Sequence, residues 1–86
     1  MTIEIDNISK IYLSCKRGML ELDLILLTFM EHTYLKLPTK LKWQFIALLN
    51  ESDQELYKLL LGQHKSKKLN NIIKKIKKSN TLLKFH

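Results

Sequence analysis

Apolar residues return at every third or fourth position along most of this chain, and that spacing places them on one face of an α-helix. Leu69, Ile72, Ile73 and Ile76 show the pattern clearly, with lysines filling most of the positions around them. The chain has only two glycines and one proline, which are few for the many turns of an all-β fold. We therefore predict an all-α fold.

Helix start and stop signals divide the chain into five predicted helices, at about 7–16, 19–34, 38–50, 52–62 and 69–79. Gly18 is a natural left-handed stop after the first helix, and Pro38 suits the first turn of the third. Ser52 is expected to cap the fourth helix, with Glu55 reaching back to it as in a capping box. Because the connections are short, the helices should pack as a compact five-helix bundle.

The second predicted helix is apolar on two sides. One stripe contains Met19, Leu22, Leu26, Phe29 and Met30, and the other contains Leu20, Leu24 and Leu27. A helix of this kind is usually surrounded by other helices. We therefore expect the second helix to be the central one.

The length of 86 residues predicts a single domain, 1–86. A chain of this size buries only roughly 60–65% of the surface that its unfolded form exposes, so an enclosed substrate cavity would compete with the core for apolar side chains. Ser9, Ser14 and Cys15 have no histidine positioned to activate them. We expect a protein that acts through its surface, with no catalytic residue, and not an enzyme.

Cys15 is the only cysteine, so no disulfide can form within the chain. With His32, His64 and His86 it has no recognised zinc-ligand spacing, and no metal site is predicted. Cys15 is expected to be a small apolar residue on the inner face of the first helix. A reactive thiol is the alternative, because Lys16 and Arg17 follow it.

The N-terminal residues 1–6 are acidic and do not resemble a signal or transit peptide. The most apolar stretch, 24–30, is too short to span a bilayer and lies between Asp23 and Glu31. We therefore expect a cytoplasmic protein that does not insert into a membrane.

Positive charge is confined to one end of the chain. Residues 1–62 hold seven basic and eight acidic groups and have a net charge of −1, whereas residues 63–86 hold eight lysines and no acid. The lysines would form a solvated helix face, or an arm that speeds the encounter with an acidic partner. An alternative function is a small basic helical module that binds nucleic acid, although no arginine, asparagine or glutamine accompanies the lysines at a spacing that reads base edges.

The segment between the first two helices, Cys15-Lys16-Arg17-Gly18-Met19-Leu20-Glu21-Leu22-Asp23, is informative. Taken alone, it is a basic helix end, a glycine stop and an acidic helix start. It also resembles the Arg-Gly-Met-x-Glu-Leu-Asp signature of the SdhE (YgfY) family of succinate dehydrogenase assembly factors, at every defined position. Three further segments resemble the family at the proper spacing: Phe29-Met30-Glu31-His32-Thr33-Tyr34, Trp43-Gln44-Phe45 through Leu48-Leu49, and Asp53-Gln54-Glu55-Leu56-Tyr57. The resemblance covers about residues 7–62 and leaves the lysine-rich segment 63–86 outside it.

The resemblance implies a five-helix fold and a protein–protein function. Family members bind the flavoprotein subunit of succinate dehydrogenase, and in some bacteria that of fumarate reductase. They promote the bond between a histidine of that subunit and the 8α-methyl group of FAD. The factor itself would bind no FAD, would be a monomer when free, and would work in the bacterial cytoplasm.

The resemblance also names a partner-binding surface, formed by Arg17, Gly18 and Glu21 with Asp23 beside them. The Arg17 guanidinium would offer a planar fork to a carboxylate or to carbonyls of the partner. Gly18 would allow two backbones to approach closely, and Glu21 would add an acceptor. Met19 and Leu22 are expected to point inward and to hold this corner rigid.

Overall fold

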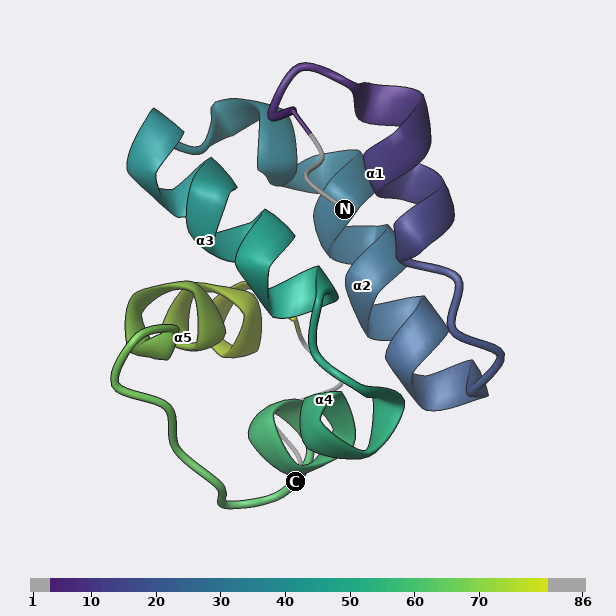
Figure 1. Ribbon diagram of the computed structural model, residues 1–86, viewed down its shortest axis with the longest axis vertical. Coiled ribbons are helices and arrows are strands. Elements are labelled where there is room, and N and C mark those ends of the chain that lie inside the picture. The colour runs from purple at the N-terminus through teal and green to yellow at the C-terminus, as the bar shows by residue number, and fades with distance from the viewer. Residues whose placement is uncertain (1–3, 81–86) are drawn as a thin grey trace.

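The computed structural model describes residues 4–80, and within that range helices are the only regular secondary structure (Figure 1). The elements in chain order are α1 (Ile8–Ser14), α2 (Leu20–His32), the 3₁₀ turn η1 (Tyr34–Lys36), α3 (Thr39–Leu49), α4 (Asp53–Leu60) and α5 (Asn70–Ser79). The five α-helices confirm the predicted fold class. The second predicted helix is shorter than expected because Tyr34 lies in η1.

The helix starts follow from local side-chain caps. Asn7 Oδ1 accepts a hydrogen bond from Lys10 N at 3.3 Å, and Ser52 Oγ accepts one from Glu55 N at 3.1 Å. Each cap satisfies an amide that the first turn of the helix leaves without a carbonyl partner. The Glu55 carboxylate meets His64 Nε2 at 3.0 Å. The predicted cap at Ser52 is therefore confirmed, and the side chain of Glu55 pairs with the connection that follows α4.

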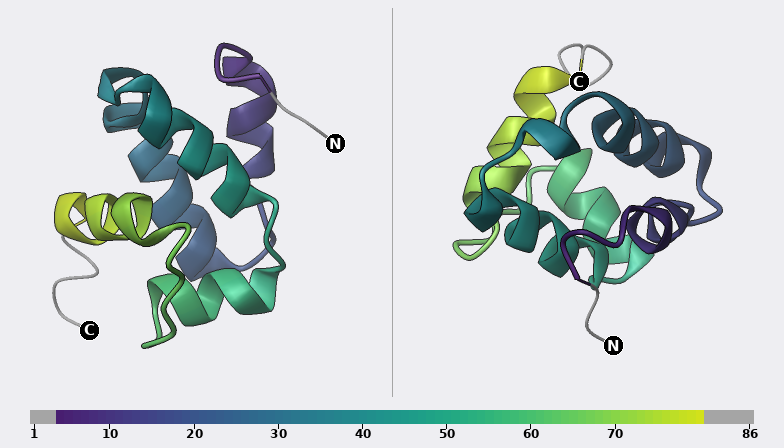
Figure 2. Two further views of the ribbon diagram at one scale, coloured as in Figure 1. Left: turned by 60° about the vertical axis from the view of Figure 1, so that its left-hand side comes forward. Right: turned by 90° about the horizontal axis from the view of Figure 1, so that it is seen from above.

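A single core joins all five helices. Its fully buried side chains include Ile11 of α1, Leu26 of α2, Phe45 of α3, Leu59 of α4 and Ile76 of α5. Figures 1 and 2 show α1 beside α2 on one side of the molecule and α3 running across it, with α4 and α5 closing the opposite end. Burial of these side chains removes apolar surface from water, which is the main force that holds a small bundle together.

The helix α5 makes close contacts with three other helices. It packs against α2, α3 and α4, and its N-terminal amide Ile72 N–H donates to Gln44 Oε1 of α3 at 3.2 Å. The lysine-rich segment therefore supplies one wall of the core.

The prediction that α2 is buried on two sides was wrong. The first stripe is buried except for Met19. In the second stripe Leu20 is 75% exposed and Leu24 is 46% exposed, and only Leu27 packs, partly buried, against the core. The physical reason is that Leu20 and Leu24 lie on the side of α2 that is turned away from the core, which the other helices leave open to water. No helix within residues 4–80 is long and apolar enough to cross a membrane.

A candidate partner-binding corner

The turn between α1 and α2 contains the one described glycine with a positive φ. Gly18 has a φ of +85°, a left-handed conformation that side chains with a Cβ rarely adopt. Apart from Gly18 itself and its two chain neighbours, no described residue has an atom within 4 Å of the place where a Cβ on Gly18 would lie. The backbone conformation therefore favours glycine here, while the space beside it is open.

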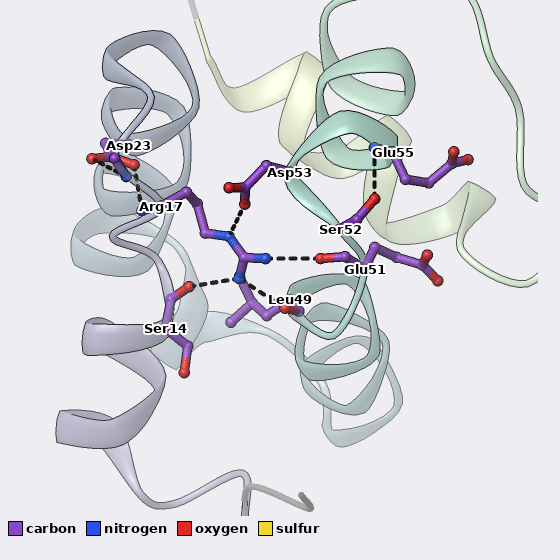
Figure 3. Close-up of polar contacts among 9 residues, drawn as sticks. Ser14, Arg17, Asp23, Leu49, Glu51, Ser52, Asp53 and Glu55 are labelled. Atoms are coloured by element: carbon purple, nitrogen blue, oxygen red, sulfur yellow. Dashed lines mark hydrogen bonds and ion pairs between the residues drawn. The ribbon is translucent and has the colours of Figure 1, made fainter.

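The side chain of Arg17 connects this turn to the end of α1 and to the junction between α3 and α4 (Figure 3). Its Nη1 donates to Ser14 O at 3.1 Å and to Leu49 O at 2.9 Å, at the ends of α1 and α3. Its Nη2 donates to Glu51 O at 2.8 Å, and its Nε donates to Asp53 Oδ1 at 2.8 Å, at the start of α4. These contacts use four of the five N–H groups that a guanidinium offers.

The fork of Arg17 is thus directed into the protein's own fold. Only 17% of its side chain is exposed. The guanidinium was expected to bind groups of a partner, but its N–H donors bind acceptors of the same chain. Asp53 and the two carbonyls lie more than 30 residues away in sequence, and no local pattern could have joined them to Arg17.

Asp23 is also engaged within the corner. Its Oδ1 accepts from Arg17 N at 2.6 Å, and its Oδ2 accepts from Gly18 N at 3.3 Å. The carboxylate of Asp23, on α2, therefore accepts hydrogen bonds from two successive backbone amides of the turn (Figure 3). The effect is to fix the backbone that presents Gly18.

The remaining residues of the signature are exposed, with the exception of Leu22. Gly18 and Glu21 are exposed, whereas Leu22 is completely buried as expected. Met19 was expected to point inward and is instead 37% exposed. It precedes the helix with an extended backbone, φ −112° and ψ 113°, so its side chain lies outside the helical period from which its orientation was inferred.

A shallow apolar notch lies next to the turn. Met19, Gln54, Tyr57 and Lys58 line it, and its volume is about 300 Å³. The side chain of Tyr57 is 43% exposed. The inner face of α4 is supplied by Leu56, Leu59 and Leu60, and Tyr57 falls outside that spacing, which is the signal that could have placed it on the surface.

Cys15 lies on the inner face of α1, as predicted, and is fully buried. Its Sγ donates to Ile11 O at 3.3 Å. Burial raises the pKa of the thiol from 9.0 to about 12, against the attraction of the Arg17 cation for the thiolate. A buried, protonated thiol is a poor nucleophile, so the alternative of a reactive cysteine does not hold.

His32 and Trp43, which belong to segments that resemble the family, are on other parts of the helices. His32 is exposed at the end of α2, and Trp43 is 46% exposed on α3. In the part of the chain that the structure describes, no three histidine, cysteine or acidic side chains come together as metal ligands would. On α5, Ile72, Ile73 and Ile76 are buried and the lysines Lys74, Lys75 and Lys78 are exposed.

Residues 4–80 therefore form a small all-α domain in which hydrogen bonds hold an exposed turn next to an apolar notch. Residues 9–80 match the sequence model of the family described as "Flavinator of succinate dehydrogenase". The chain belongs to that family. The match continues past residue 62 through α5, beyond the segment in which the signature motifs were found.

Curated relatives agree with the family match. The chain is 42% identical over 80 residues to the FAD assembly factor SdhE of Wigglesworthia glossinidia brevipalpis, an alignment that covers 91% of this chain and 95% of that protein. It is 39% identical over 80 residues to the FAD assembly factor SdhE of Pectobacterium atrosepticum, with 91% of each chain covered. It is 40% identical over 60 residues to the protein of the same name from a Serratia strain, with 70% of this chain and 68% of that protein covered.

Proposed function

We propose that this protein binds the flavoprotein subunit of succinate dehydrogenase and promotes the covalent attachment of FAD to it. Family membership and the relatives described as FAD assembly factors support the activity. The alternative of a nucleic-acid-binding module has only the lysine-rich segment in its favour.

The observation that carries this proposal is the exposure of Gly18, on a turn that Arg17 and Asp23 hold in place, and of Glu21 at the start of the adjoining helix α2. A rigid turn loses little conformational entropy on binding, which favours affinity. Glu21 offers a carboxylate to donors of the partner, and the bare backbone at Gly18 allows close approach. Arg17 and Asp23 contribute to this surface as positioning residues.

The chemistry of the attachment belongs to the flavin and to the histidine of the flavoprotein. This chain would stabilise the flavoprotein conformation in which that histidine and the methyl group of the flavin are close enough to react. It would need no catalytic residue and no FAD of its own. We place the reaction in the bacterial cytoplasm, with the factor acting as a monomer and with fumarate reductase as a second client.

The test is a reconstituted reaction of purified apo-flavoprotein, FAD and a limiting amount of this protein. Glu21→Ala should lower the rate of covalent flavin formation at least about tenfold, a typical loss for a central interface residue. Glu31→Ala, which removes an exposed acid from the other end of α2, should stay within about twofold of the wild type. Equal rates for the two variants would show that the corner is not the binding surface.

Gly18→Asn separates the two demands on Gly18. Asparagine tolerates the left-handed conformation better than other residues with a Cβ, and the space beside Gly18 is open. The variant should therefore fold, yet place a side chain on the docking surface and lower the flavinylation rate. A folded Gly18→Asn protein with wild-type activity would contradict close approach at this position.

A further inference from the structure

We propose that the notch lined by Met19, Gln54, Tyr57 and Lys58 is a second part of the docking surface and receives an apolar side chain of the flavoprotein subunit. This inference rests on the proposed function. It extends the partner-binding surface from the turn at Gly18 onto α4, a helix that the signature motif does not include.

The notch is a product of the contacts made by Arg17. The Arg17–Asp53 ion pair, 2.8 Å long, ties the turn to the first residue of α4. Met19 follows Arg17 by two residues, and Tyr57 follows Asp53 by four, one helical turn along the same side of α4. The two walls of the notch are therefore held at a fixed separation by the same guanidinium that fixes the signature turn.

Two of the four side chains that line the notch, Met19 and Tyr57, are of types that are enriched in interfaces. Met19 is 37% exposed and Tyr57 is 43% exposed, although the core beneath α4 is already filled by Leu56, Leu59 and Leu60. In a protein–protein interface tyrosine supplies contact area at modest entropic cost, and the flexible methionine adapts to the shape of a partner. The stem of Lys58 adds apolar surface while its ammonium group stays in water.

The position of Met19 identifies the occupant. Met19 lies in sequence between the exposed residues Gly18 and Glu21 and lines the notch, so the notch is continuous with the surface proposed to meet the flavoprotein. The neighbouring Leu20 is 75% exposed and would extend the same contact. A volume of about 300 Å³ is at the lower limit of small-molecule pockets, and an open hollow of this size suits one inserted side chain.

The experiment compares Met19→Ser and Tyr57→Ser with Trp43→Ser in binding to purified apo-flavoprotein. Trp43 is an aromatic residue with 46% exposure on α3, and it does not line the notch. Each notch variant should raise the dissociation constant at least about tenfold, whereas Trp43→Ser should change it less than about twofold. Equal affinities for wild type and both notch variants, or an equal loss in Trp43→Ser, would overturn the proposal.

A measurement on the unmodified proteins covers the case in which a variant fails to fold. Oxidative footprinting of the wild-type complex should show that Met19 and Tyr57 become protected while Trp43 keeps its reactivity. Unchanged reactivity of Met19 and Tyr57 in a saturated complex would overturn the inference. So would protection of these residues in the factor alone at high concentration, since a second copy of this chain would then be the occupant.

Failure of this inference is distinct from failure of the proposed function. If the wild-type protein neither binds the flavoprotein nor accelerates flavinylation, the proposed function itself is wrong. If wild type and Trp43→Ser both bind and act while the two notch variants are equally active, only the notch is excluded.

Discussion

Arg17 makes four hydrogen bonds from a side chain that is mostly buried. Three of them go to carbonyls at or just beyond helix C-termini, where the helix provides no amide for its last carbonyls. A guanidinium can reach several such acceptors at once because its donors point in fixed, divergent directions, whereas an ammonium group acts from one point. The arginine of the signature therefore has a structural reason that is independent of any partner.

Arg17→Lys should lower the free energy of unfolding by about 2–3 kcal/mol, because at least two partly buried acceptors lose their donors. Urea denaturation followed by circular dichroism measures the change. Lys36→Ala, which removes an exposed cation from η1, should alter the stability by no more than about 0.5 kcal/mol. A variant Arg17→Lys as stable as the wild type would mean that water replaces the lost donors at little cost.

Cys15 gives the protein a weakness in alkaline solution. Its thiol has a pKa of about 12 in the folded protein against 9.0 for the ordinary thiol. Below about pH 9 the thiol is protonated in both the folded and the unfolded state, and its full contribution to stability is present. That contribution is lost as the pH rises from 9 towards 12, because in this range only the unfolded chain loses the proton. Between pH 8 and pH 10 the loss from this group should be about 1.4 kcal/mol.

The check is the pH dependence of the unfolding free energy of the wild type and of Cys15→Ala. The variant loses stability at every pH because a buried side chain is truncated, but its decline from pH 8 to pH 10 should be shallower by about 1.4 kcal/mol. Tyr34, whose pKa burial also raises to about 12, is present in both proteins and cancels in the comparison. Parallel curves would show that Cys15 is not the group responsible.

At the scale of the helices, periodicity and capping residues were sufficient to predict the five α-helices but not the 3₁₀ turn η1. Asn7, Gly18 and Ser52 mark helix ends by interactions within a few residues of themselves. The same patterns could not predict which apolar stripe of α2 is covered, because that depends on where the other helices lie. Nor could they predict the contacts of Arg17 with Leu49, Glu51 and Asp53, which exist only after α1, α3 and α4 have packed.

The start of α5 depends on another helix in the same way. Leu69 precedes it without a side-chain cap, and Gln44 of α3 accepts from Ile72 N–H instead. Gln44→Met keeps the side-chain length and removes the acceptor, so it should cost about 1–2 kcal/mol and speed hydrogen exchange at the Ile72 amide. Gln54→Met on exposed α4 surface is the matched control and should leave both quantities near wild type. Unchanged exchange at Ile72 would show that the tertiary cap does not form in solution.

At the scale of the whole molecule, charge is separated between a body of net −1 and a C-terminal segment with eight lysines and no acid. Removing that segment cannot test the role of the charge, because Leu69, Ile72, Ile73 and Ile76 belong to the core. Truncation before α5 would expose the inner surface of three helices and unfold the bundle. The charge has to be changed while the apolar face of α5 is kept.

The variant that does so combines Lys74→Gln, Lys75→Gln and Lys78→Gln, three exposed positions on α5. If the lysines steer the protein toward an acidic partner surface, the association rate with the flavoprotein should fall several-fold at about 10 mM salt, where the Debye length is about 30 Å. The two rates should converge near 1 M salt, where it is about 3 Å. Dissociation rates should stay equal, because steering acts on the encounter and not on the bound contacts. Stopped-flow measurements across this range of salt decide the matter, with thermal melts to show that the variant is folded. Equal association rates of the wild type and the variant at low salt would show that these lysines do not steer the encounter. They would then only form the solvated outer face of α5.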